Sequence, residues 1–192
     1  MKTFELKGSV RPELGKKATK ALRGNDSIPC VLYGGEETIH FQVTTSDVRK
    51  LVYTPEIYLV ELNFPNRKVN AILKDLQFHP VKDTILHLDF LEVFEDKPIV
   101  MEVPIKLIGL AEGVKMGGKL SQEMRKLRVK ALYKNIPEKL DVYVEKLGLG
   151  KTIQVGALSF DNLTILNNPI NVVAAVKLTR AARGAMAKSD NK

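Results

Sequence analysis

The sequence predicts a mainly β fold with short helices, divided into two mostly β domains. Apolar and polar residues alternate along many short segments, which is the period of a strand that buries one face. Glycine, proline and asparagine residues typical of turns separate these segments, and the few helix-like segments are short. At 192 residues the chain is long enough for two small domains, each with its own core.

Strand patterns dominate the first half of the chain. The alternation is clear in residues 4–10, 39–43 and 86–90, and it favours antiparallel strands with one buried face. In the last of these segments we expect Leu86, Leu88 and Phe90 to be buried. Turn residues delimit further strands, with Gly34-Gly35 after a strand at 29–33 and Pro65-Asn66 forming a hairpin turn.

Two short helices are predicted between these strands. The first spans residues 16–23 and ends at Gly24, because glycine is a common C-terminal cap. The second spans residues 46–52, and Thr44, Thr45 or Ser46 is its N-cap.

A polar segment at residues 94–98 predicts the boundary between the two domains. The expected organisation is an N-terminal β domain at 1–94, a C-terminal β domain at 95–180 and a basic, disordered tail at 181–192. Four strands are expected in the second domain, at 101–107, 127–133, 140–144 and 171–178, with Gly-rich turns and one short helix at 155–158.

Charge is concentrated at the N-terminus. The chain has a net charge of +8, and its first 23 residues hold seven Lys or Arg against two Glu. Such clustering favours a polyanionic partner over a scattered solvated surface. No apolar run approaches the ~20 residues that span a bilayer, and the one cysteine, Cys30, has apolar neighbours typical of a core position. We therefore expect a cytoplasmic protein without a membrane partner.

The first helix places three cations on one face. Lys16, Lys20 and Arg23 fall within a stripe of about 60° at 100° per residue. Thr19 adds a neutral donor beside the stripe, and the apolar residues Ala18, Ala21 and Leu22 lie opposite and dock on the sheet. The stripe suits successive phosphates of a nucleic acid, although an exposed basic face without a partner is also common.

Polar residues with mixed donors and acceptors follow in a predicted hairpin. Its strands are joined through residues 80–84, with Gln77 and His79 on one strand and His87 and Asp89 on the other. Neutral and acidic side chains suit base edges better than phosphates, and Asp89 would need an amino group as its partner. A zinc site using the histidines and the aspartate, or an uneventful polar surface, are the alternatives.

Motifs for catalysis are not convincing. The segment 148–152, Gly-Leu-Gly-Lys-Thr, resembles the end of a phosphate-binding loop, but Glu145 stands where the first glycine is required. We interpret it as a turn between strands. No nucleophile stands in a recognisable catalytic motif, so a protein without enzymatic activity or a small-molecule substrate is expected.

The combined motifs resemble the bacterial large-subunit ribosomal protein L-twenty-five family, in its long form that includes the general stress protein Ctc. The similarity covers nearly the whole chain. The motifs that carry it are Arg11, Gly15-Lys16, Ala18-Thr19-Lys20, Leu22-Arg23, Ile28-Pro29, Tyr33-Gly34-Gly35, Gln77-Phe78-His79-Pro80, His87-Leu88-Asp89-Phe90, Gly117-Gly118, Asn135-Ile136-Pro137 and Gly150-Lys151-Thr152-Ile153.

The resemblance implies a small antiparallel N-terminal β-barrel that binds 5S ribosomal RNA at its internal loop E, in the central protuberance of the large subunit. By similarity, the RNA-binding residues are Arg11, Lys16, Thr19, Lys20, Arg23, Tyr33, Lys74, Gln77, His79, His87 and Asp89. No protein-bound cofactor is implied, and any Mg²⁺ would be bound by the RNA. The C-terminal domain would contact neighbouring large-subunit proteins or ribosomal RNA.

This chain differs from the family pattern at two positions. Family members often have consecutive arginines where this chain has Lys20-Ala21, so the planar fork of an arginine is lost. Phe78 stands where arginine is frequent. The alternative function is a protein-interaction module whose RNA affinity is incidental.

Overall fold

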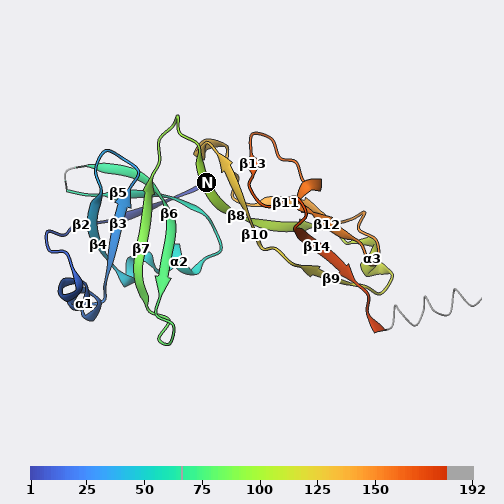
Figure 1. Ribbon diagram of the computed structural model, residues 1–192, viewed down its shortest axis with the longest axis horizontal. Helices are drawn as coiled ribbons and strands as arrows, with labels where there is room; N and C mark the ends of the chain where they lie inside the picture. Colours follow the sequence, from blue (N-terminus) through green and yellow to red (C-terminus); the bar gives the residue numbers. More distant parts are fainter. Residues whose placement is uncertain (66, 181–192) are drawn as a thin grey trace, which may run out of the picture. The chain divides into compact units, whose positions relative to one another are not determined.

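A computed structural model describes residues 1–65 and 67–180, which divide into two compact units (Figure 1). Unit 1 comprises Met1–Ile99 with Leu132–Lys134, and unit 2 comprises Val100–Ala131 with the described chain from Asn135 onward. The tail predicted at 181–192 lies outside the described residues. Both units consist mainly of strands, so the predicted fold class is confirmed.

Unit 1 is a seven-stranded sheet in the order β1-β5-β6-β7-β3-β4-β2. Its helices are α1 (Lys16–Gly24) and α2 (Thr45–Tyr53). Its strands are β1 (Lys2–Lys7), β2 (Ser9–Val10), β3 (Ser27–Tyr33), β4 (Ile39–Thr44), β5 (Tyr58–Asn63), β6 (Lys68–Phe78) and β7 (Ile85–Glu92).

The two edges of this sheet are joined by a single residue. β1 and β2 are the outermost strands in the sheet order, yet only Gly8 separates them in the sequence. The sheet must therefore curl into a barrel-like form around its core. Gly8 donates its N–H to the carbonyl of Asn63 at 3.1 Å. A Cβ on Gly8 would lie 2.7 Å from Phe64 and 2.9 Å from Phe41, so the crossing point has no room for a side chain.

Strand direction differs from the antiparallel prediction. β1 pairs with β5 in parallel, and β3 pairs with β7 in parallel, whereas the β3–β4, β5–β6 and β6–β7 pairs are antiparallel. Alternating hydrophobicity reports which face of a strand is buried, and it carries no information on the direction of the neighbouring strand. The hairpin predicted around Pro65 is confirmed by the β5–β6 pairing, although Asn66 itself is outside the described residues.

Most of the residues that the sequence predicts to be buried in unit 1 do lie in its core. Phe41, Leu88 and Phe90 are fully buried. Cys30 is also fully buried, as predicted. Val10, in contrast, is 56% exposed, because the short edge strand β2 places it away from the core.

β7 also differs from the expected alternation at its start. The pairing of β6 with β7 shifts between Gln77 and Phe78, so that Phe78 faces Ile85. This irregularity brings Ile85 into the core and leaves Leu86 half-buried, contrary to the prediction for Leu86.

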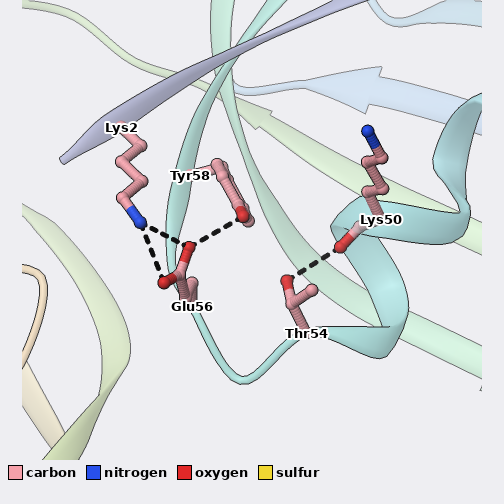
Figure 2. A network of polar contacts seen from close by, with 5 residues as sticks. All are labelled: Lys2, Lys50, Thr54, Glu56 and Tyr58. Atoms are coloured by element: carbon pink, nitrogen blue, oxygen red, sulfur yellow. Dashed lines mark hydrogen bonds and ion pairs between the residues drawn. The ribbon is translucent and has the colours of Figure 1, made fainter.

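The second predicted helix is confirmed, and its cap is resolved. α2 begins at Thr45, and the Thr44 side chain accepts a hydrogen bond from the N–H of Asp47 at 3.4 Å. Figure 2 shows the loop that follows this helix. Lys2 at the start of β1 contacts both carboxylate oxygens of Glu56 at 2.8 Å, and Tyr58 donates to the same carboxylate at 2.9 Å. These contacts hold β1 in its parallel register beside β5.

Unit 2 contains two small sheets, ordered β11-β8-β10-β13 and β12-β14-β9. The strands predicted in this region are present with small shifts, and the predicted short helix at 155–158 is a 3₁₀ turn. The elements are β8 (Ile99–Ile108), α3 (Glu112–Lys115), β9 (Lys119–Gln122), β10 (Lys126–Ala131), η1 (Tyr133–Asn135), β11 (Leu140–Tyr143), β12 (Thr152–Gln154), η2 (Val155–Ala157), β13 (Thr164–Ile165) and β14 (Val172–Lys177). The 3₁₀ turn η1 begins within the Leu132–Lys134 segment, which belongs to unit 1.

The glycine-rich segment between β11 and β12 is a turn, as predicted. The N–H of Lys151 bonds to the carbonyl of Gly148 at 3.2 Å, and Gly150 has a φ of 72°. Within the described part of the chain, no helix is both long enough and apolar enough to cross a membrane.

Candidate nucleic-acid interface

α1 presents its cations to solvent and attaches to the sheet. Lys16, Lys20 and Arg23 are exposed, whereas Ala18 and Leu22 are half-buried on the face that packs against β3. The predicted burial of Ala21 is wrong, since this residue is exposed at the margin of the contact. In addition, the Nε of Arg23 donates a hydrogen bond to the carbonyl of Leu86 at 3.1 Å. The helix is therefore tied to β7 immediately before His87.

The outward side of β7 and its neighbours forms a polar face, which we define as His40, Asp75, Gln77, His87 and Asp89. Along β7 the buried residues Leu88 and Phe90 alternate with the half-buried, outward His87 and Asp89. On β6, Gln77 lies opposite His87 and Asp75 lies opposite Asp89. On the other side of β7, Asp89 pairs with Val31 of β3, and Val31 in turn pairs with His40 of β4.

Two members of this polar face are bonded to each other. The Nδ1 of His87 lies 2.6 Å from the Oδ1 of Asp89, and the two side chains are 25% and 30% exposed. An ionised carboxylate can only accept, so Nδ1 of His87 is the donor in this contact. In the neutral form of the ring, Nε2 is then an acceptor. The Oδ1 of Asp89 is engaged by His87, and the predicted partner of Asp89, an amino group of a base, would have to approach its other oxygen.

Tyr33 and Arg11 lie beside the polar face. Tyr33 pairs with Leu91, two residues beyond Asp89. Partial burial, followed by the charges of Asp89 and Asp75, raises the pKa of Tyr33, so its hydroxyl remains a donor. Arg11 donates its backbone N–H to the carbonyl of His40 at 3.1 Å, and its Nε and Nη1 are enclosed without a hydrogen-bond partner.

Three predicted site residues stand apart from this cluster or have part of their hydrogen-bonding capacity in use. The Nδ1 of His79 accepts the N–H groups of Val81 and Lys82 at 3.2 Å, which commits the ring to the β6–β7 turn. The hydroxyl of Thr19 lies 3.0 Å from the carbonyl of Gly15 within its own helix. Lys74 is exposed where the β6–β7 register shifts, next to Asp75.

Sequence reasoning missed two members of the polar face, His40 and Asp75. For His40 a signal existed, because it alternates with the buried Phe41 on β4. A signal existed for Asp75 as well, because it lies two positions before Gln77 and the half-buried Leu76 stands between them. The register shift between Leu73 and Asp75 sets which residue of β7 it faces, and such irregularities are set by tertiary packing.

The alternative of a zinc site lacks ligands. Among residues 1–65 and 67–180, no group of three or more His, Cys, Asp or Glu side chains is placed to hold a metal ion. A zinc ion in a protein takes at least three protein ligands, and His87 and Asp89 supply only two.

A curled sheet with a polar outer face, tied to a cationic helix, is typical of the class of nucleic-acid-binding proteins. Comparison with known families narrows this class. Residues 6–90 match the ribosomal L25p family, and residues 98–180 match the C-terminal domain of ribosomal protein TL5.

Similar proteins cover the whole chain. A large ribosomal subunit protein bL25 from Bacteroides fragilis is 60% identical over 192 residues, covering 97% of this chain and 98% of that protein. The proteins of the same name from Parabacteroides distasonis and Porphyromonas gingivalis are 61% and 62% identical, each covering 98% of this chain, and 100% and 99% of their own length. The chain belongs to the ribosomal L25p family. The predicted membership is thereby confirmed, together with a structural role in the cytoplasmic ribosome rather than an enzymatic one.

Proposed function

We propose that this chain is a structural constituent of the large ribosomal subunit that binds 5S ribosomal RNA at its internal loop E, in the central protuberance. The names of its relatives, large ribosomal subunit proteins, support the placement in that subunit. The geometry of unit 1 supports the RNA contact. In this proposal α1 binds the sugar–phosphate backbone, and the polar face meets base edges and sugar hydroxyls.

The observation that carries the proposal is the contact between Arg23 and Leu86. It joins the cationic helix to the strand that carries His87 and Asp89, so both clusters can engage one ligand. From Leu86 to Leu91, the partner of Tyr33, the strand extends about 16 Å. A stretch of this length can follow one groove of an RNA helix.

Irregular RNA fits this surface better than a regular duplex. The major groove of A-form RNA is too deep and narrow for side chains, whereas non-Watson–Crick pairs in an internal loop expose base edges. The Nε2 of His87 would accept from a base amino group or a 2′-hydroxyl, and Tyr33 would donate. Phosphates alone would be repelled by Asp89 and Asp75. Magnesium that accompanies such a loop would be held by the RNA, since the polar face has no oxygen cage for it.

The proposal assigns Asp89 as a positioning residue for the His87 ring. We expect Asp89→Asn to weaken binding to a 5S ribosomal RNA transcript by roughly tenfold to a hundredfold, the range of one lost base contact of about 1–3 kcal/mol. The asparagine can donate to Nδ1, which moves the ring proton to Nε2 and removes the acceptor. Gel-shift titration of the full chain measures the affinity, and nitrogen chemical shifts of His87 report the tautomer.

Asp83→Asn is the matched control, because it removes the same charge from an exposed residue of the β6–β7 turn, outside the polar face, without touching the His87 bond, and asparagine tolerates the φ of 53° at this position. Its affinity should stay within a few-fold of the parent chain. Equal affinity of the parent chain for the 5S transcript and for an RNA duplex of unrelated sequence would disprove the proposal. Such a result would favour the protein-interaction alternative.

A further inference from the structure

Unit 2 carries a row of cations that the interface in unit 1 does not use. Lys126, Arg128 and Lys130 alternate along β10 with the buried residues Leu127, Val129 and Ala131, so the three cations project from one face of the sheet. All three are exposed. Successive members are two strand residues apart, about 6.6 Å. We call this row the β10 stripe.

The β10 stripe lies in the interior of a sheet. β10 is flanked by β8 on one side and by β13 on the other, and Lys130 lies opposite Thr164 of β13. Lysines on edge strands commonly prevent sheets from pairing edge to edge. That explanation does not apply to Lys130, because β13 already pairs with β10 at Val129 and Lys130.

The stripe is not neutralised by acids. In the described part of the chain, the ion pair within unit 2 uses another cation, Lys177 with Glu123. Among the described residues, no ion pair and no side-chain hydrogen bond engages Lys126, Arg128 or Lys130. Arg128 is held through its backbone: its N–H donates to Asn167 at 2.7 Å, and its carbonyl accepts the N–H of Leu166 at 2.9 Å. Three like charges on neighbouring outward positions repel one another, and an anionic ligand would turn this repulsion into attraction.

We propose that the β10 stripe is a second RNA-binding surface, which holds the phosphate backbone of a ribosomal RNA segment independently of the polar face in unit 1. The hydroxyl of Thr164 beside Lys130 adds a neutral donor for the same backbone. An RNA occupant is favoured over a protein, because lysine is depleted in the centres of protein interfaces whereas evenly spaced cations suit a polyanion. The contact is with phosphates and therefore independent of sequence.

The test uses the full chain in a background that weakens unit 1, Lys16→Gln with Lys20→Gln. Into this background go Lys126→Gln, Arg128→Gln and Lys130→Gln together. The matched control is Lys115→Gln, Lys146→Gln and Lys151→Gln, which removes the same charge from exposed positions of unit 2 outside the stripe. The probe is a fluorescent RNA duplex of unrelated sequence, titrated by anisotropy between about 50 and 200 mM salt.

The stripe variant should lower the slope of log K against log salt by about 2, since each lost phosphate contact removes roughly 0.7–0.9. The control variant should change the slope by less than half as much, and Arg128→Lys alone should leave it nearly unchanged. Equal slopes for the stripe and control variants would overturn the proposal, with circular dichroism confirming that both are folded. Because the probe is not 5S ribosomal RNA, this outcome is separate from failure of the function proposed for unit 1.

Discussion

The chemistry of single residues in unit 1 depends on what each residue faces. His87 and Asp89 are two positions apart on one strand, so they point the same way and bond to each other. Cys30 lies on the neighbouring strand with Leu88 as its partner, and it points into the core. Burial raises the pKa of the Cys30 thiol well above its usual range, while the charge of Arg11 has a smaller opposing effect.

This environment predicts an unreactive thiol. We expect an aromatic disulfide reagent to label Cys30 at least a hundredfold more slowly in the native chain than in denaturant, because the reactive thiolate is disfavoured and enclosed. Absorbance of the released thiolate follows the reaction. Rapid labelling of the native chain at neutral pH would show that Cys30 is accessible.

The same pKa shift has a consequence for stability. In the folded state the Cys30 thiol stays neutral, whereas in the unfolded chain the same thiol ionises above about pH 8.5. The contribution of Cys30 to folding is therefore complete below that pH and falls by about 1.4 kcal/mol per pH unit above it. The Cys30→Ala variant has no thiol to ionise at this position, so its stability does not change with pH for this reason. The difference in the free energy of unfolding between the parent chain and the variant, measured by urea titration, should therefore shrink between pH 7.5 and pH 9.5.

At the scale of elements, α1 has one face that packs against the sheet and another that carries exposed cations. Its half-buried Ala18 and Leu22 pack toward β3, and Arg23 holds its last turn against β7. In Figure 1, α1 and the turn between β6 and β7 lie toward the same end of unit 1. This placement is compatible with the proposed complex, in which the exposed lysines of the helix contact the backbone of the RNA and the polar face meets its bases.

The two lysines should contribute affinity without sequence preference. We expect Lys16→Gln with Lys20→Gln to lower the salt slope of binding by about 1.5 and to weaken 5S ribosomal RNA and an unrelated duplex to a similar degree. Lys17→Gln, an exposed position about 100° around the helix, is the control. If Lys17→Gln had as large an effect per charge, the helix would act through its net charge rather than through the stripe.

For unit 1 as a whole, closure of the sheet depends on one position. Gly8 joins the two edge strands and passes close to two aromatic rings, Phe41 and Phe64, which pack edge to face at 5.2 Å. A β-carbon at this crossing would force the rings or the strands apart.

Gly8→Ala should therefore lower the free energy of unfolding by about 1–3 kcal/mol, measured by urea titration. Gly24→Ala is the same chemical change at a position where a Cβ meets nothing within 4 Å, and it lies in a helix. We expect this control to be neutral or slightly stabilising. Equal stability of the two variants would mean that the crossing is not tightly packed.

The sequence by itself determined the mainly β class, the two short helices of unit 1 and the burial of residues such as Leu88 and Cys30. These properties follow from local periodicity and from capping residues, which act within a few positions of the chain. The family motifs also predicted His87 and Asp89 as RNA-binding residues.

Only the tertiary structure decided which strands pair in parallel, how Gly8 closes the sheet, and that Asp89 holds His87. It also decided that Asp75 lies opposite Asp89 and that Ile85 replaces Leu86 in the core. Strand direction and register shifts result from pairing between segments far apart in the chain, and alternating hydrophobicity is the same for either direction. The physical reason is that local patterns encode which face of a segment is buried, whereas its neighbours are selected by the packing of the whole unit.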